Sequence, residues 1–185
     1  KLHQLCALHQ QCIDQFDIRR FYSELHNFCS SKLSSFYFDI RKDSLYCDAS
    51  DDIRHRATRT MMHYLFNYIV RLLAPVLSFT AEEAWGIYAL TEGDNSIHLQ
   101  QFLVADPTWK NDALDKKWED IKMVRSAITN ALEQARAEKK IGSSLEAHVY
   151  VYADALPCLP ELLNELCITS GLEYRQETSP KDAVI

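Results

Sequence analysis

Glycine is scarce in this sequence, with only 4 among 185 residues, at Gly86, Gly93, Gly142 and Gly171. Globular proteins usually contain roughly 7% glycine, several times this share. No two of the four stand close enough to form a G-x-G-x-x-G motif, a Walker loop or a G-x-S-x-G elbow. The sequence therefore excludes a glycine-rich loop that holds a phosphate.

Long apolar runs are also missing. No stretch reaches the roughly 18 consecutive apolar residues that a membrane-spanning helix needs, and the chain begins at Lys1 with neither an initiator methionine nor a signal peptide. A helical pattern is already under way at Leu2 and Leu5, and the far end stops at Ile185 without an obvious cap. We therefore expect a soluble, cytoplasmic piece of a longer protein, with no membrane partner.

Patterns of catalytic and metal-binding residues are absent. The six cysteines include no C-x-x-C pair and the seven histidines include no H-E-x-x-H, so we expect reduced, mostly buried thiols. The paired acids Asp51-Asp52 and Glu82-Glu83 stand where helices are expected to begin, so capping accounts for them. No catalytic residue and no metal ligand is predicted.

Positive charge is in the minority overall but concentrated locally. Lys and Arg number 20 against 26 Asp and Glu, a net charge of −6 that argues against nucleic-acid binding by bulk charge. Residues 53–81, however, contain no acid. Their basic residues are Arg54, Arg56, Arg59 and Arg71, with His55 and His63. The planar fork of arginine suits phosphate, and the alternative is pairing with acids on a neighbouring helix, namely Asp39, Asp43, Asp51 or Asp52.

Two further basic groups flank this stretch. Arg41 and Lys42 lie near Phe36, Tyr37 and Tyr46, a mixture of cations and rings that RNA-binding surfaces use. The alternative is that the rings belong to the core and that Lys42 pairs within its helix with Asp39 or Asp43. The second group is Arg136, Lys139 and Lys140, where the alternative is simple complementation of a negative helix terminus.

Apolar spacing predicts successive helices in the first part of the chain. Steps of three and four residues run from Ile18 to Phe28 and from Leu33 to Ile40, with Asp17 and Ser34 as N-caps. Residues 53–74 predict a central, buried helix. A capping box at Thr80 and Glu83, with a staple at Phe79, predicts a helix through Trp85 to about Leu90 that ends near Gly93, followed by a surface loop over residues 97–109.

The second part predicts one long helix and a small mixed unit. The stripe from Leu114 to Ala135 predicts a helix over residues 111–140, closed by Gly142. Alternation over residues 145–152 predicts a strand that buries Leu145, Ala147, Val149 and Val151. Pro160 is expected to open a short helix that Gly171 closes, before a second strand over residues 172–175. The predicted domains are a helical bundle (1–110), a long linking helix (111–142) and a partial α+β subdomain (143–185).

Three stretches resemble the bacterial isoleucyl-tRNA synthetases, which are class I aminoacyl-tRNA synthetases. Residues 33–48 (LSSFYFDIRKDSLYCD) resemble L-S-x-F-Y-x-D-x-x-K-D-x-L-Y in that family. Residues 73–85 (LAPVLSFTAEEAW) resemble L-A-P-x-L-x-F-T-A-E-E-x-W, and residues 132–147 (LEQARAEKKIGSSLEA) resemble L-E-x-x-R-x-x-K-x-I-G-x-S-L-E-A. The first two also resemble the valyl and leucyl enzymes, whereas the third favours the isoleucyl enzyme.

This resemblance implies a mainly α fold, a class I synthetase anticodon-binding helical bundle followed by a small α+β C-terminal junction piece. The parent enzyme joins isoleucine to its tRNA through an aminoacyl-adenylate, using ATP and Mg²⁺. The family's H-x-G-H and K-M-S-K-S motifs do not occur here, and its editing domain and C-terminal zinc module are absent. The resemblance thus implies a non-catalytic, monomeric piece without cofactor or zinc, whose partners are isoleucine-specific tRNA and the missing catalytic domain of the same chain.

The expected tRNA-binding residues are the basic ones. Anticodon bases can be unstacked and laid on aromatic or guanidinium faces while Lys and Arg hold nearby phosphates, so a local positive face is sufficient despite the net charge. The alternative is a helical scaffold that binds protein. We expect contacts to the loop or stem from Arg41, Lys42, Arg54, Arg56 and Arg59, and a second contact from Arg136, Lys139 and Lys140.

Overall fold

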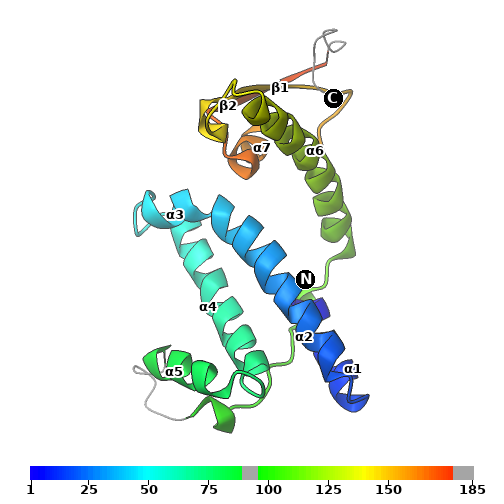
Figure 1. Ribbon diagram of the computed structural model, residues 1–185, viewed down its shortest axis with the longest axis vertical. Coiled ribbons are helices and arrows are strands. Elements are labelled where there is room, and N and C mark those ends of the chain that lie inside the picture. Colours follow the sequence, from blue (N-terminus) through cyan, green and yellow to red (C-terminus); the bar gives the residue numbers. More distant parts are fainter. Residues whose placement is uncertain (89–95, 177–185) are drawn as a thin grey trace. The chain divides into compact units, whose positions relative to one another are not determined.

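The computed structural model describes residues 1–88 and 96–176, within two compact units, Lys1–Lys110 and Asn111–Ile185 (Figure 1). The first unit contains α1 (Leu2–Asp14), α2 (Ile18–Asn27), the π-helix η1 (Phe28–Phe38), α3 (Lys42–Tyr46), α4 (Ile53–Leu73), α5 (Ser78–Tyr88) and two 3-10 turns, η3 (Ile97–Leu99) and η4 (Pro107–Trp109). The second contains α6 (Asp112–Ala137), the 3-10 turn η5 (Ser144–Glu146), β1 (His148–Tyr152), α7 (Pro160–Cys167) and β2 (Gly171–Arg175). The predicted mainly α fold is confirmed.

α2 and η1 form one continuous helical ribbon where the sequence predicts two helices (Figure 1). The carboxylate of Asp17 accepts the backbone N–H of Arg20 at 3.3 Å, which confirms the predicted first cap. The cap predicted at Ser34 is wrong, because Ser34 lies inside η1. Neither glycine nor proline interrupts this stretch. The Ser30 hydroxyl donates to the His26 carbonyl one turn earlier at 2.9 Å, so this serine is accommodated within the helix and does not end it.

The turn between α1 and α2 holds Phe16 in the left-handed region, with φ of 56° and a side chain that is 90% exposed. The N–H of Phe16 donates to the Ile13 carbonyl at 3.1 Å, and that of Asp17 donates to the Cys12 carbonyl at 2.8 Å. This pair of bonds closes α1 in the Schellman pattern, whose left-handed position usually carries glycine.

Phe16→Gly is expected to raise the free energy of unfolding by about 1 kcal/mol, because glycine adopts a positive φ without the steric cost that a Cβ imposes. The exposed ring contributes little buried surface to offset this gain. Chemical denaturation of the wild type and of the Phe16→Gly and Phe16→Ala variants measures the effect. Phe16→Ala retains a Cβ and serves as the control, so equal stability of the two variants would contradict the explanation.

α4 begins at the predicted cap, whereas α5 begins earlier than predicted. Asp52 accepts the backbone N–H of Arg54 at 2.7 Å, which confirms the predicted capping role for Asp52. α5 begins at Ser78, so Thr80 lies inside the helix and the predicted capping box is wrong. Phe79 is 92% exposed and is not a staple. The tight turn after α4 starts α5 early, with the Ser78 hydroxyl donating to the Ala74 carbonyl at 3.0 Å. The ends predicted at Leu90 and Gly93 lie outside the described residues.

α4 contributes to two buried clusters of the first unit, in agreement with its predicted central position. The Tyr22 hydroxyl, on α2, donates to the Leu72 carbonyl at 2.9 Å and ties the two helices together. The first cluster joins α1, α2 and α4 through Leu5, Cys12, Phe21, Leu25 and Leu72. The second joins α4, α5 and η3 through Val70, Ala74, Ala81, Trp85 and Ile97.

Residues 97–109 are more than the predicted surface loop. Ile97 is only 2% exposed, and η3 and η4 give the segment local structure. The Glu82 carboxylate on α5 accepts both the Ser96 hydroxyl and the Ile97 backbone N–H at 2.9 Å. The buried Ile97 side chain and the two hydrogen bonds to the Glu82 carboxylate therefore hold this segment against the bundle.

His9, on α1, is a buried histidine between two aromatic rings. Its ring centroid lies 4.7 Å from that of Phe21 and 4.5 Å from that of Phe102, and the residue is 5% exposed. Its Nε2 atom has no hydrogen-bond partner among the residues that the structure describes. Burial lowers the pKa of His9 below its usual value, because the charged ring loses its hydration.

Acidification is expected to destabilise the protein through His9. The unfolded residue takes up a proton near pH 6.5, whereas the folded residue does so only at lower pH. The stabilisation is therefore complete above about pH 6.5 and declines as the pH falls towards the folded pKa. Unfolding midpoints measured between pH 7.5 and pH 5 should fall less steeply for His9→Phe than for the wild type. His98→Phe, at an exposed site, is the control and should keep the wild-type slope.

α6 ends in a left-handed residue. Lys139 has φ of 59°, its N–H donates to the Arg136 carbonyl at 3.0 Å, and the N–H of Lys140 donates to the Ala135 carbonyl at 2.9 Å. The cap predicted at Gly142 is therefore wrong, because the helix has already closed three residues earlier. Gly142 instead donates its N–H to the Glu146 carboxylate at 2.9 Å.

β1, α7 and β2 form a parallel β-α-β unit in which Val149 pairs with Leu172. The predicted strands and the Pro160 start of α7 are confirmed. Val149 and Val151 pack against Ile128, Leu132 and Cys167.

Three details of this unit differ from the prediction or explain a residue in it. Leu145 is predicted to be buried in the first strand, but it lies in η5 and is 60% exposed. Ile168, with φ of 54°, closes α7 in place of Gly171. Gly171 starts β2 where a Cβ would lie 2.5 Å from the His148 ring, so its missing side chain permits this close pairing.

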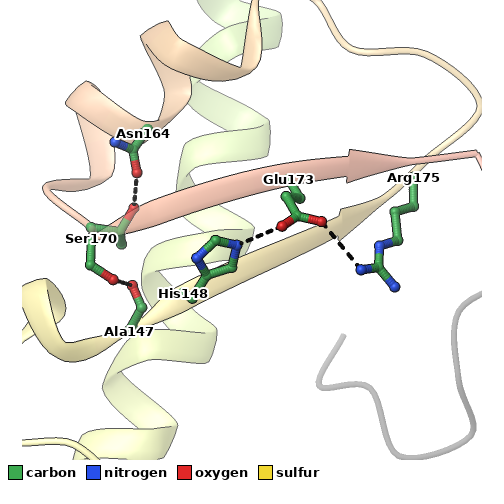
Figure 2. A network of polar contacts seen from close by, with 7 residues as sticks. Ala147, His148, Asn164, Ser170, Glu173 and Arg175 are labelled. Carbon is green, nitrogen blue, oxygen red and sulfur yellow. Dashed lines mark hydrogen bonds and ion pairs between the residues drawn. The ribbon is translucent and has the colours of Figure 1, made fainter.

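The other face of this sheet carries a polar network (Figure 2). His148 Nε2 on β1 lies 3.2 Å from the Glu173 carboxylate on β2, and Arg175 donates to the same carboxylate at 3.2 Å. The Arg175 guanidinium also lies 4.3 Å from the centre of the Tyr150 ring. Figure 2 also shows Ser170 on Ala147, where the serine hydroxyl donates to the carbonyl at 2.7 Å and fixes the start of β2 beside β1.

Candidate nucleic-acid interface

The exposed side of α4 carries a hollow with basic and aromatic walls. The lining residues recur at helical intervals of three and four, which places them on one face, and the hollow measures about 390 Å³. We call it the α4 hollow, and its residues are Arg56, Arg59, Thr60, His63 and Tyr64. A solvated helix face of this kind offers cations at one end and rings at the other.

Arg56 and Arg59 are exposed and form no ion pair or hydrogen bond through their side chains within residues 1–88 and 96–176. The pairing alternative therefore does not hold for these two guanidinium groups. The Nε atom of Arg54 lies 3.8 Å from the carboxylate of Asp48, an acid that this alternative does not name. Arg71, from the same acid-free stretch, is directed inward, donating to the Asn67 side chain at 2.8 Å and lying 4.7 Å from the Trp85 ring centre.

The rings of the hollow are held in place by neighbouring elements. The Tyr88 hydroxyl on α5 lies 2.6 Å from His63 Nδ1 and accepts from the Asn67 amide at 2.6 Å. Tyr64 meets the Trp109 ring nearly perpendicularly, with centroids 5.7 Å apart and an interplanar angle of 76°. Sequence reasoning missed Tyr64, although its position eight residues after Arg56 places it on the same helix face.

Arg41 and Lys42 stand where η1 gives way to α3. Lys42 forms an ion pair with Asp39 at 2.7 Å, as the alternative for this residue predicts, and that hydrogen bond raises the pKa of the Lys42 ammonium. Its side chain is still 63% exposed, so the pair leaves the ammonium accessible to solvent. Arg41 is half-buried beside Tyr37. The first unit thus has a second basic position apart from the α4 hollow.

The basic residues at the end of α6 are partly engaged. Arg136 forms an ion pair with Glu133 and donates to the Ser144 hydroxyl at 3.1 Å, which ties η5 to the helix end. Lys140 pairs with Glu138 at 2.7 Å, and this hydrogen bond raises the pKa of its ammonium. Lys139 is exposed. Arg136 is thus held by two side-chain contacts, whereas complementation of the helix terminus stays a prediction for these three residues.

Neither a metal site nor a membrane-spanning helix is found within the described residues. No group of three or more His, Cys, Asp or Glu side chains gathers there in a way that suits a metal ion. No described helix is both long enough and apolar enough to span a bilayer.

The sequence profile of the family described as "Anticodon-binding domain of tRNA ligase" matches residues 1–151. The chain belongs to this family. The matched range of the anticodon-binding domain includes the α4 hollow, the basic turn at Arg41 and Lys42, and the whole of α6.

Curated relatives of this anticodon-binding domain are isoleucine–tRNA ligases. The protein of Agrobacterium fabrum is 42% identical over 98% of this chain and 19% of its own length. The protein of Bartonella quintana is 42% identical over 100% of the chain and 20% of its length, and that of Gluconobacter oxydans is 46% identical over 84% and 15%. The chain thus spans about a fifth of the length of these relatives.

Proposed function

We propose that this anticodon-binding domain holds the anticodon arm of an isoleucine tRNA. The observation that carries the proposal is the α4 hollow, in which Arg56 and Arg59 stand free of acidic partners among the described residues, beside Tyr64. Guanidinium forks bind phosphate oxygens, and aromatic rings accept the unstacked bases of a single-stranded loop. Arg41, Lys42 and Arg54 are proposed as further contacts in this unit, and Arg136, Lys139 and Lys140 as a second set.

The chain would perform this recognition as one part of an isoleucine–tRNA ligase. That enzyme charges tRNA with isoleucine using ATP and Mg²⁺, in the cytoplasm and as a monomer, and its catalytic domain would be the second partner of this chain. We propose that ATP, Mg²⁺ and zinc bind elsewhere in that enzyme, and that the role of the residues in this chain is recognition.

Filter binding of the chain to isoleucine tRNA tests this function. Affinity should fall steeply with rising salt, because each phosphate contact releases counterions. It should also fall when the anticodon bases are exchanged. No binding at low salt, or binding that ignores both salt and the anticodon, would overturn the proposal and favour a scaffold that binds protein.

A further inference from the structure

We propose that the α4 hollow accepts a single unpaired nucleotide, with its base against the Tyr64 ring and its backbone phosphate between Arg59 and Arg56. This inference rests on the proposed function, because it specifies which part of an RNA loop this surface takes. It assigns base stacking to a tyrosine and phosphate binding to two arginines on the same helix face.

The dimensions of the hollow suit one nucleotide. Its volume of about 390 Å³ falls at the lower end of the range for small-molecule sites. Arg59 and Tyr64 are five residues apart on α4, a rise of about 7.5 Å along the helix. Both residues line the same hollow, so we infer that a nucleotide bound there has its base at the ring and its own phosphate at the guanidinium groups. Thr60, between them, adds a hydroxyl to the wall, although this hydroxyl already donates to the Arg56 carbonyl at 2.9 Å.

Tyr64 is oriented before any ligand arrives. Trp109 and His63 both meet its ring at steep angles, 76° and 79°, with centroids 5.7 and 5.9 Å away. The Tyr64 residue remains 44% exposed and lines the hollow. Edge-to-face contacts of this kind restrict ring rotation, so stacking a base on Tyr64 costs little additional side-chain entropy.

The supporting ring of Trp109 is itself fixed. Its centroid lies 5.7 Å from that of the buried Tyr68. The Asp106 carboxylate caps η4 by accepting the Thr108 backbone N–H at 2.8 Å and the Thr108 hydroxyl at 2.7 Å. These hydrogen bonds lower the pKa of Asp106 and keep the turn that carries Trp109 in place. The stacking wall is thus built from α4 and from the segment that precedes α6.

The combination of groups favours a nucleotide over simpler ligands. A free phosphate would use only Arg56 and Arg59, and an apolar side chain would use only Tyr64. A base-paired duplex hides the faces of its bases within the stack, so it too would leave the ring unused. Among these ligands, the unpaired nucleotide is the one that engages both ends of the α4 hollow.

Variants of Tyr64 test the stacking contact with a hairpin RNA that carries the anticodon stem and loop of an isoleucine tRNA. Tyr64→Leu should weaken binding by about 5- to 150-fold, the range expected for loss of one stacked base. The dependence of affinity on salt should not change, because no charge is removed. Tyr64→Phe should retain the wild-type affinity. Tyr150→Leu is the matched control, since Tyr150 is similarly exposed at 47% but lies outside the hollow.

Abasic RNAs provide a second test that does not depend on the stability of any one variant. Each loop nucleotide is replaced in turn by an abasic one, and binding to the wild type and to Tyr64→Leu is compared. One position should show coupling, so that its abasic substitution weakens wild-type binding but has little further effect on Tyr64→Leu. If no position couples to Tyr64 while binding stays sensitive to salt and anticodon, the nucleotide pocket is wrong and the proposed function stands. If the wild type binds no RNA, both fail.

Discussion

Phe21→Ala is expected to lower the free energy of unfolding by about 3–5 kcal/mol, the range for removing a buried aromatic ring. Phe21 is 2% exposed and belongs to the cluster that joins α1, α2 and α4. Its ring meets those of His9 at 4.7 Å and Tyr22 at 5.1 Å. Removing it leaves a cavity at the point where three helices meet, and few neighbouring groups can move to fill that space.

The control for this prediction is Phe16→Ala, which removes the same atoms from a side chain that is 90% exposed. Its free energy of unfolding should stay close to that of the wild type. Urea denaturation followed by circular dichroism measures all three proteins. A loss below about 1 kcal/mol for Phe21→Ala would mean that the helices relax into the space, contrary to the close packing expected of a protein interior.

The double variant Arg56→Ala, Arg59→Ala is expected to weaken binding of isoleucine tRNA by about 1–3 kcal/mol, roughly a factor of 5 to 150. Both guanidinium groups are solvated and unpaired among the described residues, so their removal should leave the fold intact. Because both are proposed to hold one loop phosphate, the slope of log affinity against log salt should also become shallower, by about one.

A double variant of equal charge provides the comparison. Lys116→Ala, Lys117→Ala removes two exposed cations from α6, at positions that the proposal does not assign to RNA. Titrations of both variants over a series of salt concentrations separate a specific contact from a general loss of positive charge. Equal effects of the two variants would show that only net charge matters and would contradict the assignment of Arg56 and Arg59.

Local signals predicted several helix starts correctly, but they placed the caps at Ser34 and Thr80 and several helix ends wrongly. Asp17, Asp52 and Pro160 mark helix starts, because a cap depends on the bonds of a few neighbouring residues. The closures predicted at Gly142 and Gly171 are wrong, since Lys139 and Ile168 adopt the left-handed conformation that glycine favours. Packing around a helix end can offset the steric cost of a positive φ, and nothing in a local window reveals that packing.

At the candidate site, too, the sequence indicates local features but not those that depend on tertiary contacts. The acid-free stretch correctly indicates a basic face on α4, but it does not distinguish Arg56 and Arg59 from Arg71, which packs on Trp85. Whether an arginine is free or paired depends on acids and rings brought in from other elements. Spacing along the helix would have added Tyr64 to the set, but its support by Trp109 comes from a segment 45 residues further along the chain.

By itself the sequence determined that this chain is mainly helical, that it lacks a glycine-rich phosphate loop, and that residues 53–81 carry arginines without any acid. Those properties follow from composition and from a period of 3.6 residues, which any single segment carries. Only the tertiary structure decided which arginines stay free, which rings are held beside them, and why Gly171 is glycine. Such facts depend on contacts between residues distant in sequence, because the fold of the whole chain, and not the residues adjacent in sequence, determines which groups a side chain contacts.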